Sequence, residues 1–186
     1  GEMGIRDTYS AMCRVANLPA VSRLMVILMT CKVGFATADS VTSLKLQEKG
    51  ISKETLAFLG VAFTPVALCL PALIAKYTSG PRPLAPFLQA FPVRIAINLA
   101  FSVILLAIPD KGGGTLSTSM WAALLICFLI SQVVQNVMFV AQMAFFAKVS
   151  DPAIGGTYMT LLNTIANLGA KWPSTLVLSL VDVATV

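Results

Sequence analysis

Five long runs of mostly apolar residues divide the chain, and short polar segments separate them. A bilayer core of about 30 Å needs roughly 20 mostly apolar residues per helix, and each run is close to that length or exceeds it. The runs therefore predict five transmembrane helices, at residues 19–41, 54–77, 92–109, 120–147 and 157–183. Residues 1–18 are more polar, and we expect them to form a cytosolic linker.

The residues between the runs are of the kinds that begin and end helices. Ser52 stands just before Glu54, which is the pattern of a helix start. Proline and glycine mark the other connections, at residues 81–83, 109–114 and 151–156. A transmembrane β-barrel would instead alternate apolar and polar residues in segments of about 10. The predicted fold class is all-α, a polytopic membrane helix bundle.

Composition narrows the possible functions. Hydrophobic residues make up 57% of the chain and charged residues 11%, whereas soluble domains have roughly 25% charged residues. Histidine is absent, so the usual general base is absent as well. The four cysteines are far apart and include no C-x-x-C pair, which argues against a zinc site or a disulfide framework. We therefore expect no enzyme, no catalytic residue, no metal, no resident cofactor and no nucleic-acid partner.

Basic residues near the ends of the predicted spans indicate the orientation, because cytosolic loops carry more Lys and Arg. Seven basic residues lie on the side of the N-terminus: Arg6, Arg14, Arg23, Lys76, Arg82, Arg94 and Lys148. Four lie on the opposite side: Lys45, Lys49, Lys53 and Lys111. This bias predicts a cytosolic N-terminus for the segment.

Polar residues inside the last two predicted spans gather on one face of each helix. In the fifth span they fall within an arc of about 120° at 100° per residue; they are Thr157, Thr160, Asn163, Thr164, Asn167 and Lys171. The fourth span has a similar arc of amides: Gln132, Gln135, Asn136 and Gln142. Such residues either bond to a neighbouring helix or line a substrate pathway. Around Gly169, Trp172 and Pro173 we expect the fifth span to be interrupted, as helices beside a transport cavity often are.

Charged residues inside the spans are costly and therefore informative. Lys32 lies near mid-depth of the first span, so its partner is expected to be Asp39, two turns away, or an anionic group of a substrate. Arg94 is expected to reach the cytosolic interface. The candidate substrate-binding residues are Lys32, Gln135, Asn136, Gln142, Asn163, Asn167, Lys171 and Trp172, with Asp39 and Arg94 as structural charge partners.

One segment closely resembles a known family. It reads DPAIGGTYMTLLNT at residues 151–164, NLG at 167–169 and WPST at 172–175. It resembles the acetyl-coenzyme A transporters of the endoplasmic reticulum membrane, which belong to the major facilitator superfamily. Ala170 and Lys171 depart from the family pattern, which usually has glycine and asparagine there.

The resemblance implies that the chain corresponds to helices seven to eleven of a twelve-helix carrier, with the last helix missing. The partners it implies are the lipid bilayer, the missing N-terminal six-helix half, acetyl-CoA as transported substrate, and a second copy in a homodimer. The carrier would import cytosolic acetyl-CoA into the lumen for acetylation reactions. Two alternatives stay open. One is a major facilitator permease for another anionic solute, similar to the bacterial muropeptide permeases, and the other is a membrane-embedded acyltransferase.

Overall fold

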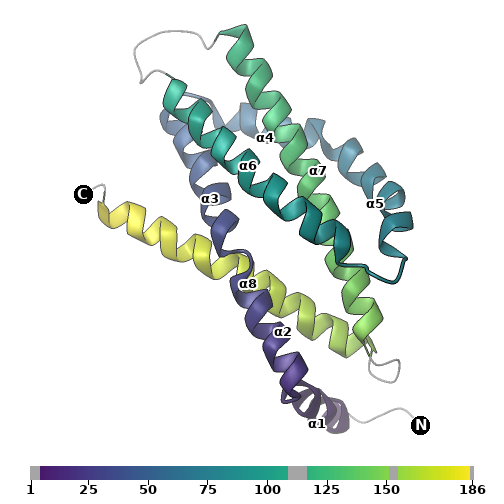
Figure 1. Ribbon diagram of the computed structural model, residues 1–186. Coiled ribbons are helices and arrows are strands. Elements are labelled where there is room, and N and C mark those ends of the chain that lie inside the picture. The colour runs from purple at the N-terminus through teal and green to yellow at the C-terminus, as the bar shows by residue number, and fades with distance from the viewer. Residues whose placement is uncertain (1–4, 109–116, 151–154, 185–186) are drawn as a thin grey trace. The chain divides into compact units, whose positions relative to one another are not determined.

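The computed structural model describes residues 5–108, 117–150 and 155–184, and every regular element in these ranges is an α-helix (Figure 1). The helices are α1 (Ile5–Ala16), α2 (Pro19–Thr30), α3 (Val33–Glu48), α4 (Lys53–Ala62), α5 (Thr64–Thr78), α6 (Ala85–Ala107), α7 (Thr118–Val149) and α8 (Gly155–Ala184). The predicted all-α fold class is confirmed. The expected linker at residues 1–18 contains the helix α1.

Four helical stretches among the described residues are long and apolar enough to cross a membrane. They are Pro19–Glu48, Lys53–Thr78, Ala85–Ala107 and Thr118–Val149. The fifth predicted span corresponds to α8, a helix of 30 residues that is not among these four stretches. Its polar face, with Asn163 and Asn167, lowers its mean hydropathy. The membrane helix bundle is confirmed, and the count of five spans stays a prediction.

Two of the predicted spans each consist of two helices. The first is divided at Cys31 and Lys32, between α2 and α3. The second is divided at Phe63, and Pro65 occupies the first turn of α5, where its missing N–H is tolerated. Pro65 therefore lies where one helix ends and the next begins.

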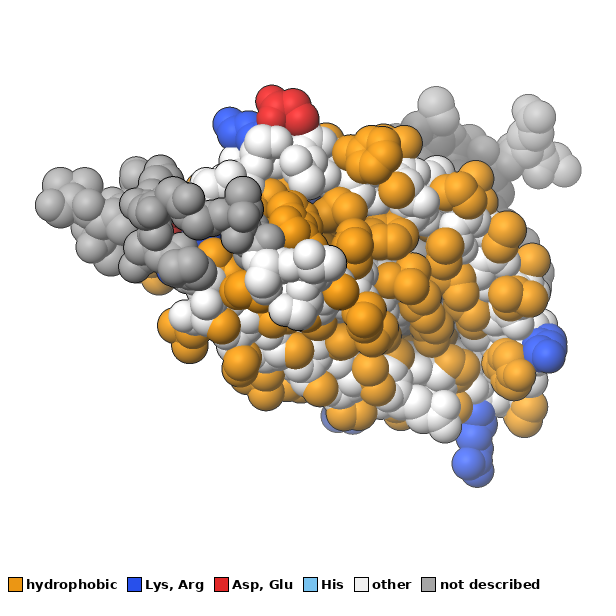
Figure 2. Space-filling view, turned by 90° about the horizontal axis from the view of Figure 1, so that it is seen from above, with side chains coloured by type: hydrophobic (Ala, Val, Ile, Leu, Met, Phe, Trp, Pro, Cys, Tyr) orange, Lys and Arg blue, Asp and Glu red, His pale blue; other side chains and the backbone are white. Residues whose placement is uncertain are grey.

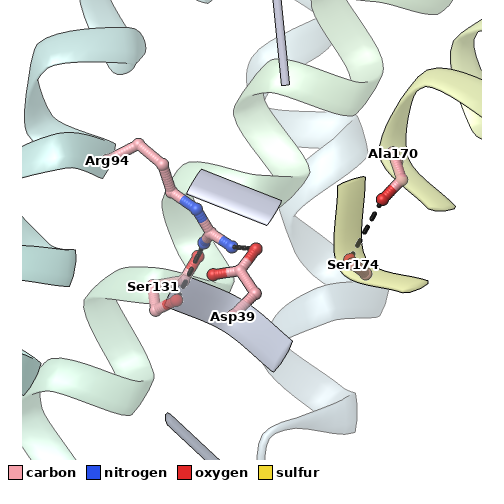
Figure 3. Close-up of polar contacts among 5 residues, drawn as sticks. All are labelled: Asp39, Arg94, Ser131, Ala170 and Ser174. Atoms are coloured by element: carbon pink, nitrogen blue, oxygen red, sulfur yellow. Dashed lines mark hydrogen bonds and ion pairs between the residues drawn. The ribbon is translucent and has the colours of Figure 1, made fainter. Parts of the chain in front are cut away.

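Prolines account for two differences from the sequence prediction. The third span was expected to start at Pro92, but α6 begins seven residues earlier, with Pro86 in its first turn and Pro92 inside the helix. The interruption expected in the fifth span is wrong, because α8 continues through Pro173. Beyond this proline the Ser174 hydroxyl donates to the Ala170 carbonyl at 3.2 Å (Figure 3). Membrane helices tolerate an internal proline, because neighbouring helices and side chains can satisfy the backbone groups that it leaves without a partner.

The chain forms two compact units, and the division falls inside α3 and α7. The first unit comprises residues 1–36 and 145–186, and in it α2 packs against α8 (Figure 1). One stripe of α8 is buried: Tyr158, Leu162, Ala166, Gly169 and Pro173. A Cβ at Gly169 would lie 2.8 Å from the Met29 Cα, so only glycine fits this close approach of two backbones.

The second unit, residues 37–144, holds an apolar core. Its buried members are Leu46, Ile51, Ile97, Phe101, Ile108 and Leu124. Many large apolar side chains of the chain point outward instead, including Leu106 and Leu68. The face drawn in Figure 2 is mostly hydrophobic, with few charged side chains. Such a surface suits a lipid environment, because soluble monomers rarely expose large apolar patches.

Candidate functional site

A cavity of about 220 Å³ lies inside the second unit, between α3, α4, α6 and α7. Its walls combine polar and aromatic side chains. The lining residues are Asp39, Thr42, Ser43, Leu56, Leu59, Gly60, Phe63, Asn98, Phe101, Phe128, Ser131, Gln132 and Gln135. A mixed wall of this kind is typical of small-molecule sites, in which a few polar groups orient a ligand among apolar ones.

Arg94 joins three helices beside this cavity (Figure 3). Its side chain is 1% exposed, and Nη2 donates to the Asp39 carboxylate at 2.5 Å. Nη1 donates to the Ser131 hydroxyl at 2.8 Å and to the Ser131 carbonyl at 3.0 Å. Because charge-assisted hydrogen bonds of this length are strong, they fix α3, α6 and α7 relative to one another within the unit.

The position of Arg94 corrects one sequence expectation and excludes one of the two partners that were expected for Lys32. Arg94 does not reach the interface, because the same face of α6 also carries the buried residues Ile97, Asn98 and Phe101. A charge on this face enters the bundle and needs an internal partner. Asp39 is that partner, so Asp39 is paired with Arg94 and not with Lys32.

Asn98 is a cavity residue that the sequence analysis did not select as a site residue. It is 8% exposed, and its Nδ2 has no hydrogen-bond partner among the described residues. Buried amide groups are normally paired, so this donor is available to a ligand. The sequence signal that could have identified Asn98 is its spacing, because it follows Arg94 by one helical turn in the predicted third span.

The amides of the fourth span divide into different environments. Gln135 and Gln132 line the cavity, although only Gln135 was among the candidates. Asn136 bonds within its own helix, from Nδ2 to the Gln132 carbonyl at 2.9 Å. Gln142 is buried, and its Nε2 has no partner in the described part of the chain.

In the first unit, two candidate residues connect α8 to the end of α2. Lys32 is half-buried, and its Nζ donates to the Ala166 carbonyl at 3.3 Å. Trp172 donates from Nε1 to the Met29 carbonyl at 2.9 Å. Met29 lies in the last turn of α2, where carbonyls lack helical partners, so the indole satisfies one of them.

The polar face of α8 lies opposite its buried stripe. Thr160, Thr164, Asn167 and Lys171 are exposed, and Asn163 is partly buried. Within the first unit this face is therefore not covered, and the expectation that it turns toward the interior of the segment stays a prediction. The other expectation, that it faces the remaining half of a carrier, stays a prediction.

The matches to known proteins extend over nearly the whole chain. A family profile described as Acetyl-coenzyme A transporter 1 matches residues 2–84 and 81–186. An uncharacterized protein of Schizosaccharomyces pombe is 30% identical over 182 residues, which cover 98% of this chain and 34% of the relative. An uncharacterized membrane protein of Saccharomyces cerevisiae is 28% identical over 209 residues, covering 98% of this chain and 37% of the relative.

The chain thus spans about a third of the length of these relatives. No solved structure matches it. The family profile covers the chain from residue 2 to its end and agrees with an all-helical, membrane-spanning bundle. The chain therefore belongs to the acetyl-coenzyme A transporter 1 family.

Proposed function

We propose that this chain is part of a secondary carrier that moves acetyl-CoA from the cytosol into the lumen of the endoplasmic reticulum by alternating access. The match to the acetyl-coenzyme A transporter 1 family over nearly the whole chain is the observation that carries this proposal. In such a carrier the chain supplies helices of the C-terminal half. The N-terminal half supplies the opposite wall of the pathway, because carriers bind substrate between repeated helix sets.

Buried polar groups support a transport role over a scaffold role. The second unit holds Arg94, Asp39 and Asn98 between apolar helices, with a cavity beside them. Polar and charged groups at membrane depth are expensive, and they typically mark substrate pathways. A structural membrane protein would need neither the cavity nor the unpaired amide.

The basic residues of the first unit suit the charge of the proposed substrate. Coenzyme A esters carry several phosphate charges, which require cations and hydrogen-bond donors. Lys171 is exposed on the polar face of α8, next to Asn167 and Asn163 along the helix. Lys32 lies at the end of α2. In the proposed carrier these residues and Trp172 contact the substrate, while the amides of Gln135, Asn136 and Gln142 border its path.

A double-label uptake measurement tests the proposal. The full-length protein is reconstituted into vesicles and given acetyl-CoA labelled with one isotope on the acetyl group and another on the adenine ring. A carrier accumulates both labels inside in equal proportion. An acyltransferase separates the two labels, also in detergent, where transport is not possible. Absence of uptake, with accumulation of a different anionic solute, would support the permease alternative instead.

A further inference from the structure

The cavity between α3, α4, α6 and α7 has a charge pattern that does not suit phosphate groups. Asp39 is the single charged residue among its described lining residues, which include no Lys, Arg or His. Arg94 is not among them, and its guanidinium is occupied by Asp39 and Ser131. The Arg94 charge is already balanced by the Asp39 carboxylate, so a phosphate in this cavity would approach that carboxylate and find no further cation among the lining residues. Such an arrangement is unfavourable in a low-dielectric interior.

The cavity does provide a hydrogen-bond donor. Asn98 is more than nine-tenths buried, and its Nδ2 has no partner in the described part of the chain. The terminal torsion of an asparagine has a broad energy minimum, so a small rotation turns the amide into the cavity that the residue lines. A ligand acceptor would then remove the free-energy cost of the unpaired amide.

A hydrogen-bond acceptor lies near this donor. Asp39 binds Arg94 through Oδ2, and 34% of the Asp39 side chain is exposed. An ionised carboxylate has about four lone-pair sites, so Asp39 can accept further hydrogen bonds from a ligand. Arg94 and Asn98 are one turn apart on α6, which places the Asp39 carboxylate and the Asn98 amide on neighbouring parts of the wall.

The rest of the wall is apolar and aromatic. Phe63, Phe101 and Phe128 line the cavity, and the rings of the last two meet edge to face with centroids 5.0 Å apart. Aromatic faces pack well against aliphatic chains and against heteroaromatic rings. The wall therefore suits a ligand group that is neutral and largely apolar, with polar atoms along one edge.

We propose that this cavity binds a neutral group that carries a hydrogen-bond donor beside an acceptor, and that it does not bind phosphate. Asp39 accepts from the group and Asn98 donates to it. Two parts of a coenzyme A ester have this chemistry, namely the amides of the pantetheine arm and the edge of the aminopurine ring. Identifying these parts as the ligand rests on the proposed function, in which the phosphates lie at other residues.

Thiol protection in the full-length protein tests the cavity without requiring transport. Gly60 lines the cavity, and a Cβ there meets no heavy atom within 4 Å, so Gly60→Cys should fold and present a thiol to the cavity. Its reaction with a water-soluble maleimide is followed by peptide mass spectrometry, which separates it from the native cysteines. The probes are S-methylpantetheine, adenosine and pyrophosphate.

Slower labelling with S-methylpantetheine or adenosine, and an unchanged rate with pyrophosphate, is the expected result. The neutral compound that protects identifies which part of the substrate the cavity holds. Protection by pyrophosphate, or protection by neither neutral compound, would overturn the proposal. Uptake of acetyl-CoA without such protection would reject this inference alone, whereas protection without uptake would reject the transport proposal alone.

Asn98→Leu in the same background removes the donor while keeping a similar side-chain volume. We expect about tenfold weaker protection by the neutral compound, the loss that one good hydrogen bond accounts for. Ser102→Ala is the matched control, because Ser102 lies one turn further along α6, is outside the lining, and bonds to the Asn98 carbonyl at 3.0 Å. Equal protection in the Asn98→Leu and Ser102→Ala variants would contradict the role of Asn98. If Asn98→Leu does not fold, the comparison of the three probes in the Gly60→Cys protein still tests the proposal.

Discussion

At the scale of single residues, the Arg94–Asp39 ion pair stands out among the described residues, because the Arg94 side chain is almost completely buried. We expect Asp39→Ala to destabilise the protein by about 3 kcal/mol, since removing one partner leaves a buried, uncompensated charge. The double variant Arg94→Met with Asp39→Ala should recover much of that loss. Thermal unfolding in detergent measures both.

A surface pair gives the comparison for this prediction. The Lys45 Nζ and the Glu48 Oε2 are 2.7 Å apart, but both side chains are well exposed. Glu48→Ala should therefore cost at most about 0.5 kcal/mol. If Asp39→Ala were as mild as Glu48→Ala, the Arg94 charge would have to be stabilised by some other group.

Lys32 offers a prediction about charge and transport. Lys32→Gln removes the positive charge, and its effect on stability should be within about 1 kcal/mol, since one hydrogen bond to the Ala166 carbonyl is at stake. If Lys32 contacts substrate phosphates, uptake of acetyl-CoA by the full-length protein should fall sharply. Raising the ionic strength should reproduce part of that fall in the unmodified protein.

Lys53→Gln is the control for the Lys32 substitution, because Lys53 is exposed at the start of α4 and also loses one charge. Uptake of acetyl-CoA by the Lys53→Gln variant should equal that of the unmodified protein. Normal uptake in Lys32→Gln would mean that this lysine serves only to hold α8 against the end of α2.

Residue-level chemistry could be predicted only in part from the sequence. A spacing of four residues puts Arg94 and Asn98 on one stripe of a helix. Asp39, however, lies 55 residues before Arg94, and no local pattern reports contacts of that range. Gln135 and Gln132 lie close together in sequence and both line the cavity, whereas Asn136 bonds to its own helix. Which amides face a cavity depends on helix rotation, and neighbouring helices set that rotation.

At the scale of elements, the crossing of α2 and α8 depends on Gly169. A Cβ there would lie 2.8 Å from the Met29 Cα, and backbone cannot move aside as a flexible side chain does. Gly169→Ala should therefore destabilise the protein by about 1–3 kcal/mol through overpacking. Thermal unfolding in detergent gives the measurement.

Gly156→Ala is the matched control on the same helix, because a Cβ at Gly156 meets nothing within 4 Å. Alanine favours helix over glycine by about 1 kcal/mol, so this variant should be neutral or more stable. Equal melting temperatures for the two variants would show that α2 and α8 do not approach closely at Gly169.

Hydrophobic runs predicted the helices well, and prolines were the main source of error. Ser52 was recognised as a helix start, and its hydroxyl accepts from the Thr55 amide at 3.2 Å. The predicted third span started at Pro92, which lies inside α6, and Pro86 occupies the first turn of that helix, a position that proline favours. The break at Cys31 and Lys32 has no proline to mark it. It lies where Lys32 and Met29 contact α8, contacts that local sequence does not encode.

At the scale of the whole molecule, the structure changes the evidence for orientation. Arg94 is inside the bundle and contributes no charge to a loop, which leaves six basic residues on the side of the N-terminus against four on the other. Lys49, on the second side, donates to the Ile108 carbonyl at 2.8 Å at the end of α6. The remaining excess still favours a cytosolic N-terminus, because the rule counts Lys and Arg near span ends.

Thiol labelling of intact membrane vesicles that contain the protein checks this orientation. Cys13 is exposed in α1, before the first span, and Lys53→Cys places a second thiol after it. If Pro19–Glu48 crosses the membrane once, the two thiols lie on opposite sides. An impermeant maleimide added to vesicles with their cytosolic face outward should label Cys13 at once and the introduced thiol only after detergent. The reverse order would place the N-terminus in the lumen, and labelling of both before detergent would show that this stretch does not span the bilayer.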